Sequence, residues 1–516
     1  MPASVKKRFL VSLVSNALRA GMSFFTGLII ARGLSPAGYG ELSFLLGSFV
    51  ALRSLLDLGT SNAFYTFIAQ EKRPLRYYSW YGLWLAFQFL FTLCAVAFFL
   101  PADLRDRLWL GHDRSAILLA FSASFLQQQI WLTVTQIGEA ARKTVQVQSL
   151  NIALAALYLS SAILLYKYGG ISVRSVLALL VLLYLAMSFA GLRVLAPFAR
   201  QGGGAGEEIS PREMFGKYRA YCAPLAMLSA AGFVYDFSDK WLLQHFGGAS
   251  QQGFYQVAFQ FATISVLATT SILNIFWKET AEAVRLNDSE RVRSIFRRVS
   301  RGLYMFGAVL SGFLIPWSGQ VIGALLGRPY SQAGPVLGLM LLYPLHQSLG
   351  QVAGTVFLAS EKTKQYMAVS LAGMFLSLPI SYLLQAPAQG HLIPGLGLGA
   401  MGMAVKMVGL NILSVNILLW FIARNHKWKF DYLYQIAGLG IMLTAGWAVK
   451  LAAAAVFPGM DSFDRLHLIA PFLISGCLYL VLAGCAIWSL PWLIGMDREE
   501  IRRYAGRLGE IIGNRL

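Results

Sequence analysis

The sequence predicts an all-α membrane protein with about 14 transmembrane helices, and three observations support this fold class. The chain has 516 residues, of which 57% are hydrophobic and only 13% charged, whereas a soluble domain carries about 25% charged residues. Apolar windows of roughly 20 residues, the length of a membrane-crossing helix, recur along nearly the whole chain. Lys and Arg gather in alternate connections between these windows. A β-barrel is disfavoured, because its segments are short and alternating.

The expected spans follow one another with short connections, which suits a compact helical bundle. The connection at 198–217 is the longest, and its Gly-rich stretch predicts a cytosolic linker at 201–217 between an N-terminal lobe, 1–200, and a C-terminal lobe, 218–424. Residues 425–494 add two spans, and 495–516 form a basic tail that fits an amphipathic helix on the inner surface. The predicted spans are 10–32, 41–68, 77–100, 115–136, 146–167, 174–197, 218–244, 252–277, 302–325, 335–359, 365–386, 400–423, 435–457 and 467–493.

The charge distribution orients this map. With the N-terminus inside, the inner connections carry most of the 43 Lys and Arg residues, as the positive-inside rule requires. Both termini are therefore expected in the cytosol. The net charge of +19 is then explained by topology, without a nucleic-acid partner. No cleavable signal peptide is expected, because the first apolar run carries Arg19 and lacks a small-residue cleavage site.

Two segments resemble each other at a constant offset, the one that separates Gly33 from Gly248. Residues 33–44, GLSPAGYGELSF, join the first two spans, and residues 248–259, GASQQGFYQVAF, join the seventh and eighth. Six spans separate the copies, so both have the same membrane orientation. This predicts two parallel six-helix lobes plus two C-terminal helices, a plan known among transporters, with a site between the repeats. Chance similarity of two glycine turns is the alternative.

Two arginines lie at mid-span depth, where charge is costly and usually faces a bundle interior or a watery cavity. Arg53 stands in the apolar run 42–68, with Asp57 one helical turn later. The two can form a packing ion pair at i, i+4, which is the alternative to a functional role. Arg19 has no acidic residue nearby in sequence, which favours a functional role. A cationic path through the bundle indicates an anionic cargo.

Further candidates for the lining of this cavity are Asp239, Lys240 and Lys406. Asp239 and Lys240 lie near the outer end of the seventh span, where local neutralisation with Asp236 is the alternative. Lys406 lies near the outer start of the twelfth span, where its ammonium could snorkel to the interface. The run Gln127-Gln128-Gln129, with Asn151, suits sugar hydroxyls, but helix–helix hydrogen bonds are an equal alternative.

The sequence offers no sign of a metal or cofactor site. The four cysteines fall in apolar windows without CxxC spacing, and the six histidines are scattered. Residues 397–402 match GxGxxG, but no strand precedes them, so they are interpreted as a turn rather than a dinucleotide site. No cofactor is expected, and coupling to H+ or Na+ is left open, with Asp57 a candidate for the ion.

Several segments together resemble bacterial polysaccharide and O-antigen flippases of the Wzx type. They are IIARGLSPAGYGELSF at 29–44, LDLG at 56–59, DKWLLQHFGG at 239–248 and LLGRPYSQAGPVLGLM at 325–340. This family belongs to the multidrug/oligosaccharidyl-lipid/polysaccharide exporter superfamily. The resemblance implies a non-enzymatic, two-lobed bundle in the bacterial inner membrane that alternates between inward and outward states. It also implies a polyprenyl-diphosphate-linked oligosaccharide as cargo, a surface-polysaccharide precursor, with Arg19, Arg53 and Asp57 in the substrate cavity.

Three other functions stay open at this point. A lipid II flippase is a relative that also has 14 spans. A multidrug or ion antiporter of the same superfamily is disfavoured, because 12 spans and an acidic cavity would be expected. A membrane polysaccharide polymerase or ligase would need a larger outer loop than the one at 101–114. A polymerase and glycosyltransferases are the expected partner proteins of the flippase.

Overall fold

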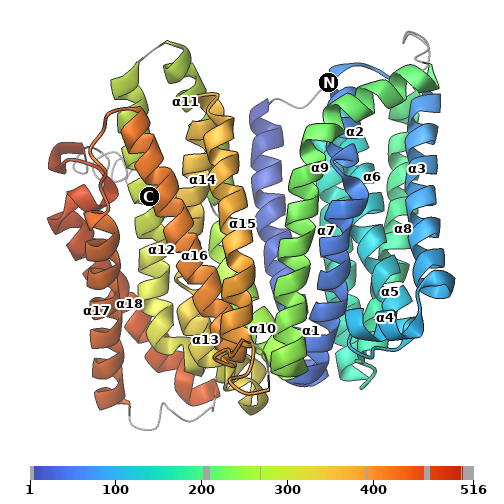
Figure 1. The fold of residues 1–516 in the computed structure, drawn as a ribbon. Coiled ribbons are helices and arrows are strands. Elements are labelled where there is room, and N and C mark those ends of the chain that lie inside the picture. Colours follow the sequence, from blue (N-terminus) through green and yellow to red (C-terminus); the bar gives the residue numbers. More distant parts are fainter. Residues whose placement is uncertain are drawn as a thin grey trace. The chain divides into compact units, whose positions relative to one another are not determined.

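The computed structural model describes residues 5–200, 210–267, 269–286, 288–390, 393–457, 465–500 and 503. All regular secondary structure in these ranges is helical (Figure 1), in agreement with the predicted fold class. The chain divides into two compact units. Unit 1 comprises residues 1–256 and 374–399, and unit 2 comprises residues 257–373 and 400–516. The predicted division at 201–217 stays a prediction. Most of the tail at 495–516 lies outside the described residues.

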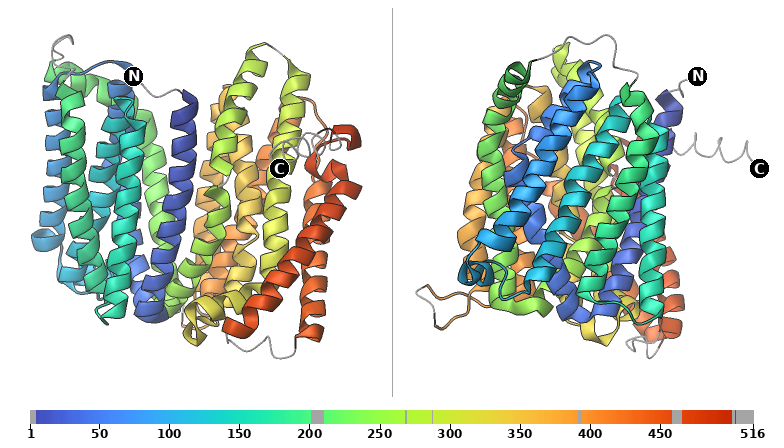
Figure 2. Two further views of the ribbon diagram at one scale, coloured as in Figure 1. Left: turned by 180° about the vertical axis from the view of Figure 1, so that it is seen from behind. Right: turned by 90° about the vertical axis from the view of Figure 1, so that its right-hand side faces the viewer.

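Unit 1 is a bundle in which α1 packs against α7 and α9, and α8 packs against α5, α6 and α7. Since α5 and α6 follow each other through η2, α8 lies beside α7 and beside this continuous rod, in the blue-to-green bundle of Figure 2. The elements are α1 (Val5–Asp57), α2 (Thr60–Gln70), α3 (Leu75–Cys94), η1 (Ala95–Phe99), α4 (Ala102–Leu108), α5 (Arg114–Phe125), η2 (Leu126–Ile130), α6 (Trp131–Ala140), α7 (Thr144–Lys167), α8 (Val173–Arg200), α9 (Pro211–Leu242), η3 (Leu243–Gly247) and the first half of α10 (Gly248–Leu267).

Unit 2 has its core around α12, which packs against α11, α13, α14 and α17. Buried side chains such as Tyr304 of α12, Leu345 of α14 and Tyr479 of α18 belong to one hydrophobic cluster. The elements are α11 (Thr269–Arg285), α12 (Ser289–Leu326), η4 (Arg328–Tyr330), α13 (Ala333–Met340), α14 (Tyr343–Ala359), α16 (Gly399–Asn425), α17 (Leu433–Val456), α18 (Arg465–Ser489) and η5 (Pro491–Ile494), while α15 (Thr363–Gln385) starts in unit 2 and ends in unit 1.

Two sharp kinks shape the first unit. The backbone at Ser35, within α1, has φ 66° and ψ 168°, and Gly248, between η3 and α10, has φ 80° and ψ 173°. A side chain in this region strains the backbone, so Ser35 is held there by its surroundings. In Figure 1 the dark-blue residues before Ser35 and the lighter-blue residues after it form two separate rods.

The two kinked helices cross at a pair of glycines. A Cβ added to Gly40 would lie 1.8 Å from the carbonyl oxygen of Ala249, and one added to Gly253 would lie 2.1 Å from that of Pro36. Only glycine allows the backbones to approach so closely.

The kinks and the crossing correct the register of the repeated segments. The sequence comparison aligned Gly33 with Gly248. In the structure Ser35 is the counterpart of Gly248, because the two residues have nearly the same backbone angles. Gly40 and Gly253 follow these kinks at equal distances along the chain, and they also meet each other at the crossing. The structure therefore aligns Gly248 with Ser35 instead of Gly33.

Eleven helices among the described residues are long and apolar enough to cross a membrane. The chain is therefore a multi-pass membrane protein, whereas the count of 14 spans stays a prediction. Two of the eleven, Ser12–Asp57 and Arg212–Ile264, run through the kinks and each cover two predicted segments. The predicted span at 335–359 is divided between α13 and α14, each shorter than about 20 residues, the length of one crossing.

Candidate functional site

The guanidinium of Arg53 lies inside unit 1 with few polar partners. Arg53 is half-buried in the second leg of α1, residues 36–57, and its Nη1 donates one long hydrogen bond of 3.4 Å to Gln128 Oε1. Its Nε is buried and has no hydrogen-bond partner among the described residues. A buried charge is stable only when it is paired or strongly hydrogen-bonded. Arg53 therefore has unused capacity for an anionic or polar ligand.

A small cavity surrounds this guanidinium. The polar residues Ser124, Gln128 and Gln129 line it together with apolar side chains of α1 and α5. Its volume is about 10 Å³, about enough for one water molecule. The apolar walls lower the local dielectric, which strengthens any contact that the guanidinium makes with an anion. A cavity of this volume has no room for anything larger, so a ligand requires it to widen.

The glutamines at this site come from a π-helical turn, η2, between α5 and α6. Gln127 donates to the hydroxyl of Tyr184 in α8 at 3.0 Å, and Gln128 accepts from Arg53. Gln129 is 1% exposed, and neither atom of its amide has a partner in the described structure. The extra residue in a π-helical turn redirects neighbouring side chains, and such turns are frequent at functional sites. Gln129 is thus a second polar group with unused hydrogen bonds.

Asp57 has a local structural contact instead of an ion pair with Arg53. Its carboxylate accepts from the backbone N–H of Ser61 at 2.9 Å and from the hydroxyls of Ser61 and Thr60 at 2.8 and 3.1 Å. These groups belong to the first turn of α2, whose free N–H groups need acceptors. The Arg53–Asp57 ion pair considered from the sequence is wrong, because Asp57 satisfies the start of the next helix.

Arg19 lies in the first leg of α1, residues 5–34, and is exposed. No hydrogen bond or ion pair to its side chain occurs in the described part of the chain. Its charge acts electrostatically on Tyr184, the tyrosine that also receives the hydrogen bond from Gln127. Arg19 is therefore near Tyr184, whereas Arg53 contacts Gln128 directly.

Asp239 and Lys240, in α9, are held by contacts within unit 1. Asp239 is buried, and its Oδ1 accepts from the hydroxyl of Ser381 at 2.6 Å. The stem of Lys240 packs on Gly47 of α1, and its Nζ donates to the backbone carbonyl of Asp236 at 3.4 Å. Lys406 lies in α16 of unit 2 and is 2% exposed. The cluster around Arg53 therefore includes neither Asp239 nor Lys406.

Comparisons with known proteins place the chain in a family. A family model described as "Polysaccharide biosynthesis protein" matches residues 5–277. The chain belongs to the polysaccharide biosynthesis protein family. The matched region includes both kinks, the crossing at Gly40 and Gly253, and the cluster around Arg53. No curated protein sequence matches the chain.

Solved structures share the fold of this family member at low sequence identity. The structure of "Lipid II flippase MurJ, inward closed conformation" is 13% identical in sequence and has a TM-score of 0.64. The match covers 92% of this chain and 99% of the chain in that structure. A multidrug resistance MATE family transporter of the MOP superfamily, in an inward-facing conformation, is 14% identical, with coverage of 81% and 99% and a TM-score of 0.57. A MOP superfamily transporter from Pyrococcus furiosus, described as having a binding pocket of reverse polarity, is 12% identical, with coverage of 83% and 97% and a TM-score of 0.54.

Some features of this site could not be recognised in the sequence. The glutamine run stood out in an apolar span, and the sequence left open whether it binds sugar hydroxyls or forms helix–helix hydrogen bonds. In the structure Gln127 forms a helix–helix hydrogen bond, whereas the side-chain amide of Gln129 does not. Asn151 also takes the packing role, since it accepts from the indole of Trp131 at 3.1 Å. Ser124 and Tyr184 carried no sequence signal, because single hydroxyls are common in membrane helices.

Proposed function

We propose that the chain is a flippase that moves a polyprenyl-diphosphate-linked oligosaccharide from the cytosolic to the outer leaflet of a bacterial inner membrane by alternating access. The oligosaccharide is a precursor of a surface polysaccharide, such as O-antigen or exopolysaccharide. Membership of the polysaccharide biosynthesis protein family supports the pathway, and the shared fold with superfamily transporters supports the bundle type.

The single observation that carries this proposal is that Arg53 Nε and both side-chain amide atoms of Gln129, which line the same cavity, are buried without a hydrogen-bond partner among the described residues. A diphosphate offers paired oxygen acceptors that match the planar fork of arginine. A sugar hydroxyl both donates and accepts, which matches a free amide group. The exposed Arg19 adds a second cation in the same unit. Together these groups provide what a charged glycolipid head needs when it leaves water.

The physical problem of transport follows from the substrate. A diphosphate and many hydroxyls cannot enter hydrocarbon without replacement hydrogen bonds, whereas the polyprenyl tail can stay in the bilayer. Charge-assisted contacts to Arg19 and Arg53 would supply these bonds during the crossing. An inside-negative membrane potential favours outward movement of an anion. Coupling to H+ or Na+ through Asp57 is the alternative driving force that we propose to test.

Complementation tests this function. A bacterial strain that lacks its own O-antigen flippase should regain surface polysaccharide when it expresses this chain, with the polymerase and glycosyltransferases of the pathway supplied by the host. Rescue of a strain that lacks its lipid II flippase, without rescue of polysaccharide export, would contradict the proposal and assign the chain to the peptidoglycan precursor. Increased drug resistance with neither rescue would assign it to multidrug transport.

The proposed membrane orientation has its own test. Both termini should lie in the cytosol, because most Lys and Arg residues then fall in inner connections. A fluorescent reporter that folds only in the cytosol, fused after Leu516, should be active. Alkaline phosphatase, which is active only outside, should be inactive at the same position. Phosphatase activity there would contradict the 14-span map.

A further inference from the structure

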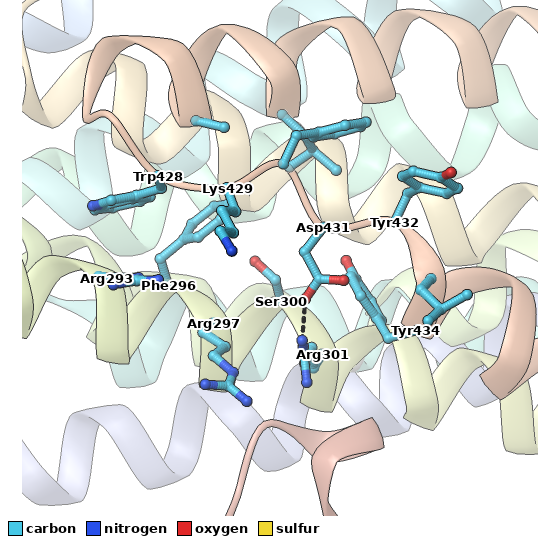
Figure 3. A pocket seen from close by; sticks show the side chains of 14 residues that line it. Arg293, Phe296, Arg297, Ser300, Arg301, Trp428, Lys429, Asp431, Tyr432 and Tyr434 are labelled. Atoms are coloured by element: carbon cyan, nitrogen blue, oxygen red, sulfur yellow. Dashed lines mark hydrogen bonds and ion pairs between the residues drawn. The ribbon is translucent and has the colours of Figure 1, made fainter.

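Unit 2 contains a second pocket, lined by both charged and aromatic side chains, that the proposed transport path does not use. It has a volume of about 510 Å³ and lies between the first turns of α12 and the segment that connects α16 to α17 (Figure 3). This volume is in the range of small-molecule sites. All of its lining residues belong to unit 2.

The charges that line this pocket are mostly positive and not all neutralised. Arg301 forms an ion pair with Asp431, the only acidic side chain among the described lining residues (Figure 3). Arg293 lies 3.8 Å from a glutamate one turn earlier in α12. Arg297 and Lys429 are exposed, and neither has an ion pair or hydrogen bond within the described residues. Two cations from opposite sides of the pocket are therefore available to an anion.

The floor of the pocket carries a buried hydroxyl without a partner. Ser300 is 3% exposed, and its Oγ has no hydrogen bond in the described structure. Ser300 lines the pocket, and in Figure 3 it lies between Arg297, Lys429 and Asp431. A hydroxyl can rotate and donate to a ligand oxygen, and a buried polar group without any partner destabilises the fold. Ser300 is thus a lining residue whose hydroxyl has an unused hydrogen bond.

Aromatic side chains form much of the remaining wall. Phe296, Trp428, Tyr432 and Tyr434 line the pocket beside the cations. Aromatic rings next to Lys and Arg are typical of the membrane–water interface. Most of the lining residues fall within 293–301 and 428–434. These residues belong to the predicted connections 278–301 and 424–434, which the positive-inside rule places on the cytosolic side. Anionic lipids in that leaflet attract basic segments.

We infer that this pocket binds the phosphoryl group of an anionic phospholipid headgroup, at a site separate from the transport path. Arg297 and Lys429 provide the opposing charges, Ser300 donates a hydrogen bond, and the aromatic rings contact the glycerol end of the acyl chains. The Arg301–Asp431 pair holds the two sides of the pocket at a fixed separation. This inference goes beyond the proposed flippase function and needs no glycan substrate for its test.

Calorimetric titration of the purified full-length protein in a neutral detergent tests the site. Three probes distinguish the source of the phosphoryl group: short-chain phosphatidylglycerol, short-chain phosphatidylcholine and inorganic phosphate. We expect saturable binding of phosphatidylglycerol alone. The double variant Arg297→Ala/Lys429→Ala should bind it at least about tenfold more weakly, because two charge-assisted contacts are lost. Ser300→Ala should reduce the affinity about fivefold without loss of folding, since its hydroxyl has no partner among the described residues.

A matched control removes equal charge from the same predicted membrane side. Arg285→Ala/Lys364→Ala changes two exposed cations of unit 2 that do not line the pocket, so its affinity for phosphatidylglycerol should equal that of the parent. If this control loses as much affinity for phosphatidylglycerol as the pocket variant, the binding depends on general surface charge and the inference is overturned. Unchanged affinity in the double variant and in Ser300→Ala would also overturn the inference. If inorganic phosphate binds as tightly as the lipid, and the same variants abolish this binding, the ligand of the pocket is a soluble phosphate and not a lipid.

Discussion

Arg53 in unit 1 and Arg301 in unit 2 are both arginines of long membrane helices, but their surroundings differ. Arg301 donates to the backbone carbonyl of Trp492 and to the carboxylate of Asp431, and its guanidinium carbon lies 5.0 Å from the ring centre of Tyr434. Among the described residues, Arg53 has one hydrogen bond of 3.4 Å and a buried Nε without a partner.

The difference separates two uses of a buried cation. Breaking a satisfied pair leaves an uncompensated partner and destabilises the fold, so Arg301 is interpreted as a structural residue. A cation whose hydrogen bonds are unmet gains most from a ligand, so Arg53 is interpreted as a binding residue. The hydrogen-bond partners of each guanidinium therefore distinguish the two residues. The following variants test that comparison.

The largest effect on stability is expected for Arg301→Ala. The substitution removes two charge-assisted hydrogen bonds and leaves the Trp492 carbonyl without its donor, a loss of about 3 kcal/mol. Thermal unfolding of the purified protein and its abundance in the membrane measure this loss. If Arg301→Ala has normal abundance and a normal melting temperature, Arg301 is not a structural residue. Arg424→Ala, an exposed arginine at the end of α16, is the matched control and should leave stability unchanged.

Arg53→Ala should show the reverse pattern, with normal abundance and surface-polysaccharide export reduced about 100-fold. This reduction corresponds to the loss of a bidentate contact with a phosphate of about 2.7 kcal/mol. Arg53→Lys should keep part of the activity, because lysine retains the charge but not the planar fork. The measurement is polysaccharide complementation, normalised to protein level. If Arg53→Ala instead lowers the amount of protein in the membrane, Arg53 is a structural residue like Arg301.

Arg19→Ala should reduce export about tenfold while the protein still inserts, since Arg19 is exposed and no partner within the described fold is lost. Arg19→Lys should again be partly active. The same complementation assay applies. Full export by the alanine variant at normal abundance would exclude Arg19 from the substrate path and leave Arg53 as the principal cation of unit 1.

Asp57 gives the smallest expected effect and tests whether its role is local. Asp57→Ala should destabilise the protein by about 1 kcal/mol, because the first turn of α2 loses its acceptor. Asp57→Asn retains an oxygen acceptor, so it should preserve both the melting temperature and export. Collapse of export in Asp57→Asn at unchanged stability would instead assign Asp57 to H+ or Na+ coupling.

The sequence by itself determined the class of the molecule and its all-helical character. Long apolar windows are sufficient for this, because a backbone in hydrocarbon must satisfy its hydrogen bonds internally. It also pointed to Arg19, Arg53 and the glutamine run, since polar groups stand out against an apolar background. It could not set the register of the repeated segments. The close contact of Gly40 with Gly253 fixes that register, and a contact between residues so distant in the chain has no local signature.

Only the tertiary structure decided which polar residues have partners. Asp57 sits one helical turn after Arg53, yet it accepts from α2 because the chain turns at Leu58 and Gly59, where φ is positive. The extra residue of η2 directs three consecutive glutamines to three different surroundings. The pocket at Ser300 joins α12 to a segment that comes several helices later in the chain. Spacing along the chain gives neighbours on one helix, whereas hydrogen-bond satisfaction depends on the helices that pack against it.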